Sequence, residues 1–336
     1  MMRLPAFTYV APRTVEDAVR AMADAGPDGM LVAGGTDLYP NMKRRQFEPK
    51  TLVGLRAITS LRSVGGSARE GMRLGACTTL SSVAGHPEVA RAYAGVATAA
   101  GLVSSPQLRN MGTLGGNVCV DTRCNYYNQT YEWRKAIGFC MKKEGDICLV
   151  APSSSRCWAV SSSDTAPALW SLGASVRLVG PAGERTIPIA ALFHDDGIQY
   201  LTRRPDEILT ELVLPPAEGW RSVYLKLRRR GAFDFPILGV AAAARFEGDV
   251  VREARIVLGA VASLPREATK AAGMLIGQRL TTEIIEAAAD AAAGPAKPLD
   301  NTDLTHPYRK KVTRVYVARA LARLAGLDQG PALETL

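Results

Sequence analysis

The chain has 336 residues, a net charge of +9 and 47% hydrophobic residues, the composition of an ordinary soluble globular protein. A chain of this length is too long to fold around one hydrophobic core, so we expect two or three subdomains. No apolar run reaches the roughly 20 residues that a membrane span needs, and the N-terminus lacks the apolar stretch of a signal peptide. We therefore expect a cytoplasmic protein without a membrane span.

The basic charge raises the question of nucleic-acid binding. However, Lys and Arg are spread over the whole chain, and the densest runs, at 43–45, 228–230 and 309–311, are three residues long. No zinc-finger spacing and no RNA-binding aromatic signature accompany these runs. We expect no nucleic-acid partner, and a zinc-stabilised nucleic-acid-binding protein is a distant alternative.

Residues 1–55 predict a small α/β subdomain. Thr14 is typical of a helix N-cap, and the apolar residues at 15, 18, 19 and 22 lie on one helical face. A short buried strand over Met30 to Ala33 runs directly into Gly34-Gly35. A second strand is expected over Thr51 to Leu55.

Residues 56–216 predict a second α/β subdomain, which is interrupted by a cysteine-rich loop insertion at about 119–160. It should hold a strand and turn at 73–80, a helix from Pro87 to the region of Gly101, a helix after Asp164, and short strands at 175–179, 186–189 and 207–214. Pro215-Pro216 marks a domain boundary.

Residues 217–336 predict a C-terminal α+β domain, with a three-stranded sheet over 222–227, 239–245 and 254–261. Two helices, at about 281–293 and 307–325, close the chain. The predicted fold class is therefore α+β.

Two Gly-Gly turns form the first candidate binding site. They are Leu31-Val-Ala-Gly-Gly-Thr-Asp-Leu38 and Gly112-Thr-Leu-Gly-Gly-Asn-Val118, and each is expected to open from a buried strand. Glycine lets backbone N–H groups approach a phosphate closely. One such turn commonly serves chain conformation alone, whereas two of them favour a shared nucleotide. Neither the G-x-G-x-x-G fingerprint nor a P-loop occurs.

The second candidate site is a group of cysteines, because five of the six lie between Cys119 and Cys157. In a reducing compartment, crowded thiols are better interpreted as metal ligands than as disulfides. Their spacing lacks C-x-x-C pairs, so spacing alone does not identify the metal. The tyrosines and tryptophans of the insertion predict that it packs rather than remains disordered. Basic residues there, including Lys142, either offset cluster charge or form a solvated face.

Three ordered motifs carry a family resemblance: 31–37, 109–117 and 163–168. They resemble the FAD subunit of the xanthine oxidase family of molybdenum hydroxylases and the medium subunit of carbon monoxide dehydrogenase, over essentially the whole chain. The resemblance implies that Asp164 bonds toward the adenosine end of FAD and that Lys226 lies near the isoalloxazine ring. It implies that FAD is bound by Leu31, Val32, Ala33, Gly34, Gly35, Thr36, Asp37, Thr113, Leu114, Gly115, Gly116, Asn117, Asp164 and Lys226.

Asn117 and Asp164 lie 47 positions apart, which indicates an insertion of roughly 40 residues relative to these subunits. The insertion resembles that of the β subunit of 4-hydroxybenzoyl-CoA reductase, which holds a 4Fe–4S cluster. That similarity implies four cluster ligands, Cys124, Cys140, Cys148 and Cys157. In an alternative set, Cys119 replaces Cys124. Cys77 and Cys119 are otherwise interpreted as packing residues.

The resemblance also implies partners and a reaction. A large molybdopterin subunit and a small subunit with two 2Fe–2S clusters would join this chain in a dimer of heterotrimers. Reduced ferredoxin would donate electrons for the reductive removal of a phenolic hydroxyl from an aromatic CoA thioester. No catalytic residue is expected here, because another subunit would bind the substrate. The alternative is the flavin subunit of an oxidative molybdenum hydroxylase.

Overall fold

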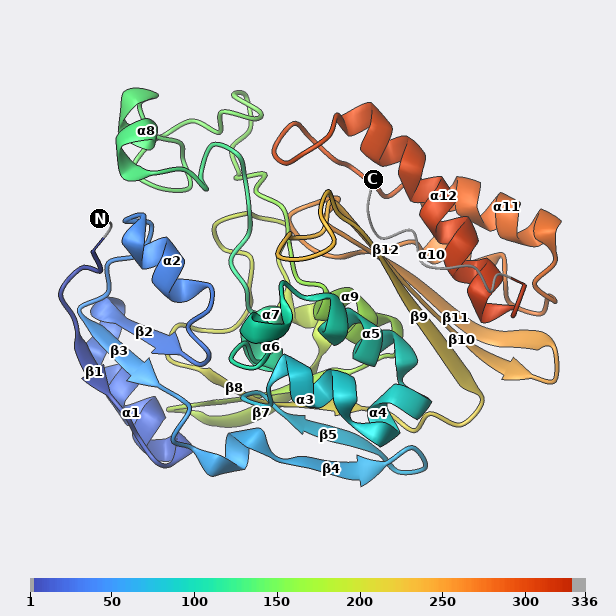
Figure 1. Cartoon of the computed structure of the whole chain (residues 1–336), viewed down its shortest axis with the longest axis horizontal. Helices are drawn as coiled ribbons and strands as arrows, with labels where there is room; N and C mark the ends of the chain where they lie inside the picture. Colours follow the sequence, from blue (N-terminus) through green and yellow to red (C-terminus); the bar gives the residue numbers. More distant parts are fainter. Residues whose placement is uncertain (1–2, 328–336) are drawn as a thin grey trace.

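The computed structural model describes residues 3–327 and contains three β-sheets with helices packed around them (Figure 1). The N-terminal unit is a parallel sheet of order β1-β3-β2, with β1 (Thr8–Val10), β2 (Gly29–Val32) and β3 (Thr51–Gly54), flanked by α1 (Val15–Ala25) and α2 (Leu38–Lys43). Thr14 Oγ1 accepts a hydrogen bond from Asp17 N at 3.1 Å, which confirms the predicted N-cap. Ala18, Val19 and Met22 form the buried face of α1.

The second sheet is antiparallel, with the order β4-β5-β8-β6-β7. Its strands are β4 (Val64–Ser67), β5 (Gly71–Gly75), β6 (Ser175–Gly180), β7 (Gly183–Pro188) and β8 (Ile208–Leu214). The helices of this unit are α3 (Leu80–Gly85), α4 (Pro87–Ala92), α5 (Ala94–Leu102), α6 (Pro106–Arg109), α7 (Leu114–Val118) and α9 (Thr165–Ser171). Short 3₁₀ turns lie at η1 (Gly26–Asp28), η2 (Thr59–Arg62) and η3 (Ile189–Leu192).

The single helix predicted from Pro87 to Gly101 is wrong, because the chain breaks it at Tyr93 into α4 and α5. Tyr93 has φ −128° and ψ 48°, outside the helical region. Its buried side chain donates a hydrogen bond from the hydroxyl to Pro215 O at 2.8 Å. This tertiary contact involves a residue 122 positions away, which local helix propensity does not register.

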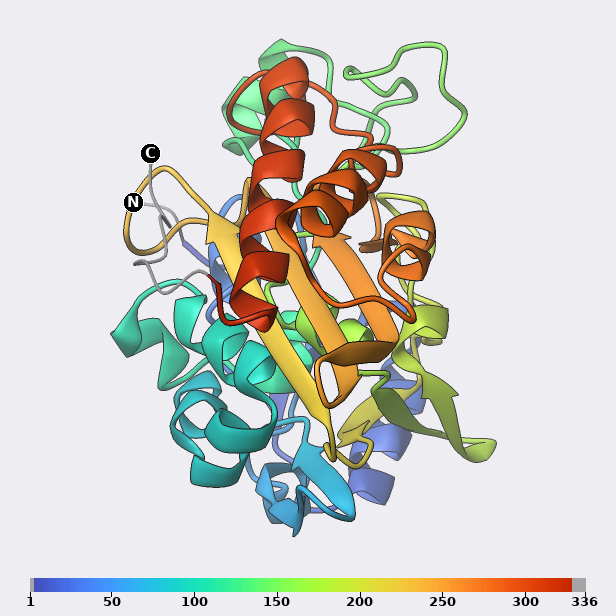
Figure 2. The same ribbon diagram turned by 90° about the vertical axis from the view of Figure 1, so that its right-hand side faces the viewer.

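The C-terminal sheet is antiparallel with the order β12-β11-β10-β9. Its strands are β9 (Trp220–Leu227), β10 (Leu238–Glu247), β11 (Val250–Gly259) and β12 (Arg266–Glu267). The two-residue β12 is one strand more than predicted, and it is too short to carry a sequence pattern. Figure 2 shows the C-terminal helices lying across one face of this sheet. They are α10 (Thr269–Gly273), α11 (Thr282–Ala292) and α12 (His306–Leu324). The α+β class is confirmed.

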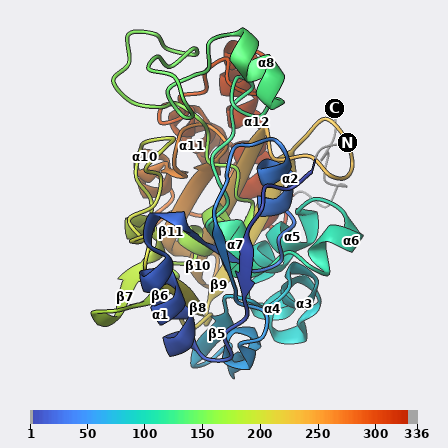
Figure 3. The ribbon, with the colours of Figure 1, turned by 90° about the vertical axis from the view of Figure 1, so that its left-hand side faces the viewer.

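The cysteine-rich insertion, residues 119–160, rises from the body of the protein, and its helix α8 (Tyr131–Ala136) stands at the top of Figures 1 and 3. Its packing is confirmed. The guanidinium of Arg134 is buried and donates to Arg44 O at 2.9 Å, just after α2. On the other side, Asn125 N donates to Asn301 O at 2.8 Å in the C-terminal domain. No helix within residues 3–327 is long and apolar enough to cross a membrane.

Candidate functional site

The two glycine turns lie against each other. The first turn follows β2, as predicted, and leads into α2. The second follows helix α6 instead of a buried strand, so that part of the prediction is wrong. Gly112 N donates to Leu108 O at 2.7 Å, which closes α6 immediately before the turn. Thr113 then caps α7, because its Oγ1 accepts from Gly116 N at 3.2 Å.

Gly34 is where the two turns touch. A Cβ atom at this position would collide with the carbonyl oxygen of Met111, in the chain just before Gly112. Only glycine allows the backbones to approach this closely. Together the turns line one open pocket, here named the turn pocket, with a cavity volume of about 340 Å³. A pocket of this size is within the range of ligand and cofactor sites.

Most of the residues predicted to bind FAD line the turn pocket. They are Leu31, Val32, Ala33, Gly34, Gly35, Thr36, Asp37, Thr113, Gly115, Gly116 and Asn117. Leu114 lies in the hydrophobic core instead, and its side chain is fully buried. Helical geometry explains this difference, because successive residues of α7 point to different sides.

Donor groups in the turn pocket fit the diphosphate of FAD. Within the described residues, the backbone N–H groups of 34–37 donate no hydrogen bond. Successive free N–H groups form a cradle for an anion. The side-chain oxygen of Asn117 accepts from Ser163 Oγ at 3.0 Å and from Thr165 Oγ1 at 2.7 Å. These hydrogen bonds fix the orientation of the Asn117 side-chain amide. Its NH₂ group is then available to donate to a ligand. The residues present therefore fit FAD.

Asp164 and Lys226 do not line the turn pocket. Instead, they form an ion pair with each other outside it. Lys226 Nζ lies 2.9 Å from Asp164 Oδ2 and donates to Leu102 O at 3.0 Å. Tyr224 donates from its hydroxyl to Asp164 Oδ1 at 2.7 Å. Burial raises the pKa of Asp164 and lowers the pKa of Lys226, while their mutual attraction opposes both shifts. Val103, next to Leu102, lines the pocket, but direct contact of the pair with FAD stays a prediction.

Several side chains at or beside the turn pocket were not predicted as FAD-site residues. Arg123, from the insertion, forms an ion pair with Asp37 of the first turn and lies 4.4 Å above the ring of Phe235. Phe235, from the β9–β10 loop, and the half-buried Tyr200 line the pocket. The residues come from segments far apart in the sequence, and none stands in a recognisable motif.

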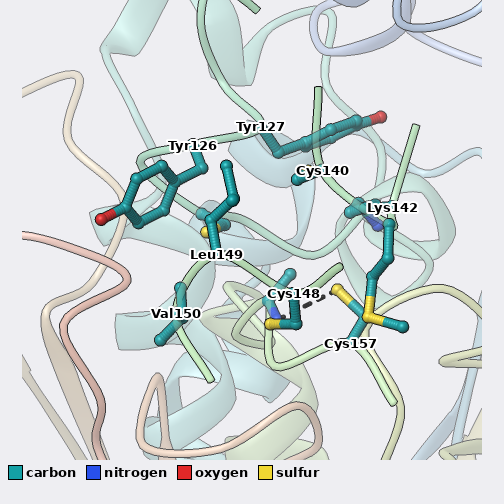
Figure 4. Close-up of a pocket in the computed structure, with 11 residues that line it drawn as sticks. Tyr126, Tyr127, Cys140, Lys142, Cys148, Leu149, Val150 and Cys157 are labelled. Carbon is teal, nitrogen blue, oxygen red and sulfur yellow. Dashed lines mark hydrogen bonds between the residues drawn. The ribbon is translucent and has the colours of Figure 1, made fainter. Parts of the chain in front are cut away.

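A second pocket, here named the cysteine pocket, lies in the insertion (Figure 4). Its lining includes all four predicted cluster ligands, Cys124, Cys140, Cys148 and Cys157, each at least 92% buried. Cys119, the alternative ligand, and Cys77 line the turn pocket instead. Burial raises the pKa of the Cys124 thiol to about 12 and that of Cys157 to about 11.

The four cysteines of the cysteine pocket do not form a site for a single metal ion. In the described part of the chain, no three His, Cys, Asp or Glu side chains lie close enough to share one metal ion. A 4Fe–4S cluster is bound by four cysteine thiolates, one on each iron, so its ligands surround a volume instead of meeting at a point. Four cysteines that line one pocket match this ligand set in residue type, and cluster binding stays a prediction.

Comparisons with known proteins agree with this geometry. Residues 5–217 match the FAD binding domain in molybdopterin dehydrogenase, and residues 222–324 match the CO dehydrogenase flavoprotein C-terminal domain. The carbon monoxide dehydrogenase medium chain of Hydrogenophaga pseudoflava is 30% identical over 94% of this chain and 96% of its own length. The aldehyde oxidoreductase FAD-binding subunit PaoB of Escherichia coli is 32% identical over 78% of this chain and 83% of its own.

The solved structure of the carbon monoxide dehydrogenase from Hydrogenophaga pseudoflava superposes with a TM-score of 0.80 at 28% identity, covering 97% of this chain and 99% of that one. Fold and pocket therefore define an FAD-binding oxidoreductase subunit. The chain belongs to the FAD-binding medium subunits of the molybdenum hydroxylase family, the family of carbon monoxide dehydrogenase and xanthine dehydrogenase.

Proposed function

We propose that this chain is the FAD and 4Fe–4S electron-transfer subunit of a 4-hydroxybenzoyl-CoA reductase-like complex. One observation carries the proposal: four buried cysteines from separate parts of the insertion line one pocket, although the sequence places them up to 33 positions apart. Thiolates are the ligands of iron–sulfur clusters. A loop stabilised only by packing has no need to collect four thiols in one place.

The cluster and the flavin have complementary roles in this proposal. FAD, when bound, exchanges electrons singly or in pairs, so it links one-electron and two-electron carriers. The free N–H groups of the first turn bind the diphosphate, and Asn117 orients its amide toward the same ligand. The cysteines hold the cluster in an apolar setting with Tyr126, Met141 and Leu149. The insertion therefore adds a one-electron site to the flavin subunit.

The proposal extends to partners and location. A large molybdopterin subunit and a small subunit with two 2Fe–2S clusters complete a cytoplasmic dimer of heterotrimers. Reduced ferredoxin supplies electrons to the cluster, and the overall reaction removes a phenolic hydroxyl from an aromatic CoA thioester. Asp164 and Lys226 support FAD binding from behind the turn pocket through Leu102.

The second candidate is the flavin subunit of an oxidative molybdenum hydroxylase. The names of similar proteins favour it: the nicotine 6-hydroxylase medium subunit of Paenarthrobacter nicotinovorans is 25% identical over 95% of this chain. A zinc-stabilised nucleic-acid-binding protein is disfavoured, because no single-ion site occurs between residues 3 and 327.

The test is the cofactor content of anaerobically purified protein and of two cysteine variants. We expect wild type to hold FAD, iron and sulfide in a ratio of about 1:4:4. Cys140→Ser should lose the iron and keep the FAD, because Cys140 lines the cysteine pocket only. Cys119→Ser is the comparison for the iron content and should keep the iron, because Cys119 lines the turn pocket and not the cysteine pocket. FAD without iron in wild type would leave the oxidative hydroxylase as the better candidate.

A further inference from the structure

Lys142 lies between the cysteine pocket and the turn pocket. It lines the cysteine pocket (Figure 4), and its side chain is only 5% exposed. Its ammonium donates to Asp121 Oδ1 at 2.8 Å, to Thr122 Oγ1 at 2.8 Å and to the carbonyl oxygen of Gly197. Asp121 belongs to the lining of the turn pocket. One buried ion pair therefore joins the two pockets.

Aromatic rings place the same ammonium between the pockets. Lys142 Nζ lies 4.8 Å from the ring centroid of Tyr127, which lines the cysteine pocket. It lies 5.5 Å from the ring centroid of Tyr200, which lines the turn pocket. With three hydrogen bonds and two rings around it, the charge has a fixed position and is shielded from water.

Gly197 connects Lys142 to one of the cysteines. Gly197 N donates to Cys157 O at 2.9 Å, while its carbonyl accepts from Lys142. A Cβ atom at Gly197 would lie 2.6 Å from Cys157 Sγ, so the backbone at Gly197 packs directly against this sulfur atom.

We infer that Lys142 is a positioning residue that sets the reduction potential of the cluster and couples it to the flavin pocket through Asp121; the inference rests on the proposed cluster. Reduction adds one negative charge to the cluster. A buried cation beside a ligand sulfur stabilises that charge, and Asp121 partly opposes it. We therefore expect that removing the charge of Lys142 lowers the reduction potential of the cluster and that removing the charge of Asp121 raises it.

The test is a redox titration of the cluster, followed by electron paramagnetic resonance, in the purified chain and three variants. At a fixed solution potential, Lys142→Met should lower the ratio of reduced to oxidised cluster about tenfold. This change corresponds to a fall of about 59 mV in the reduction potential of a one-electron couple. Asp121→Asn should raise the ratio. Lys143→Met is the matched control, because Lys143 is the neighbouring lysine, is more exposed and pairs with Glu144, and it should leave the ratio unchanged.

Cofactor analysis separates the two ideas. Wild type without iron and sulfide would overturn both the cluster and the role of Lys142. Wild type with a cluster, but with an unchanged ratio in Lys142→Met and Asp121→Asn, would overturn the role of Lys142 alone. If Lys142→Met does not retain a cluster, Asp121→Asn and Lys142→Arg decide. The inference is supported if the ratio of reduced to oxidised cluster is raised in Asp121→Asn and is equal to that of wild type in Lys142→Arg. Any other pair of results contradicts it.

Discussion

Single residues decide whether the turn pocket can form, and Gly34 is the most constrained of them. Because a methyl group there would meet the Met111 carbonyl, Gly34→Ala should separate the turns and weaken FAD binding at least tenfold. Flavin fluorescence titration of the apo-protein measures this loss. Gly273→Ala, which has open space around the new methyl group, is the control and should bind FAD as wild type does. Normal affinity in Gly34→Ala would contradict the role of this close approach.

Cys77 gives a pH-dependent prediction at the same scale. Burial raises the pKa of its thiol to about 11, and its Sγ lies 3.9 Å from Leu55 O. The thiolate is the reactive form, and a raised pKa lowers its population at neutral pH. Alkylation of Cys77 should therefore be slow at pH 7 and should accelerate about tenfold per pH unit up to about 11. Mass spectrometry of iodoacetamide-treated protein measures the rate, and a plateau near pH 8 would contradict the raised pKa.

At the scale of elements, the insertion depends on the C-terminal domain for its position. Asn301, in the segment between α11 and α12, is 2% exposed and bonds to both ends of the cysteine-bearing chain. Its carbonyl accepts from Asn125 N at 2.8 Å, next to Cys124, and its Nδ2 donates to Trp158 O at 2.6 Å, next to Cys157. The geometry of two proposed cluster ligands is thus fixed by a residue outside the insertion.

Asn301→Ala should loosen the insertion while leaving the sheets intact. The variant leaves the half-buried Trp158 carbonyl without its donor, at a cost of about 1 kcal/mol. Hydrogen exchange should rise in residues 157–160 and stay unchanged in β10. Asp303→Asn is the control, since its ion pair with Arg229 is exposed on both sides. Equal hydrogen-exchange rates of residues 157–160 in the two variants would show that Asn301 does not stabilise the position of the insertion.

The sequence predicted most elements because their patterns are local. The apolar periodicity of α1 and its Thr14 cap can be read from neighbouring residues, and so can β6 and β8 of the second sheet, whereas β4 was not predicted. The break at Tyr93 depends on Pro215, and β12 depends on pairing with β11, so neither has a local signal. The candidate site divides in the same way. Its glycine turns and cysteines stand in motifs, whereas Tyr200 and Phe235 reach the pocket only through the fold.

At the scale of the whole molecule, the Asp164–Lys226 pair joins the FAD-binding unit to the C-terminal sheet. Asp164 precedes α9, and Lys226 lies on β9 with a side chain that is fully buried. Lys226→Met should destabilise the protein by about 3–5 kcal/mol, because it leaves a carboxylate buried without its partner. Adding Asp164→Asn should restore part of that loss. Urea unfolding measures both values, and additive losses in the double variant would contradict a coupled pair.

The whole account depends on two redox sites within one chain, and cofactor analysis of the anaerobically purified protein tests this most directly. The account predicts about one FAD with four iron and four sulfide per chain, and loss of the iron alone in Cys140→Ser. Protein that holds FAD but neither iron nor sulfide would contradict it, because the four cysteines of the insertion would then line a pocket without a cluster.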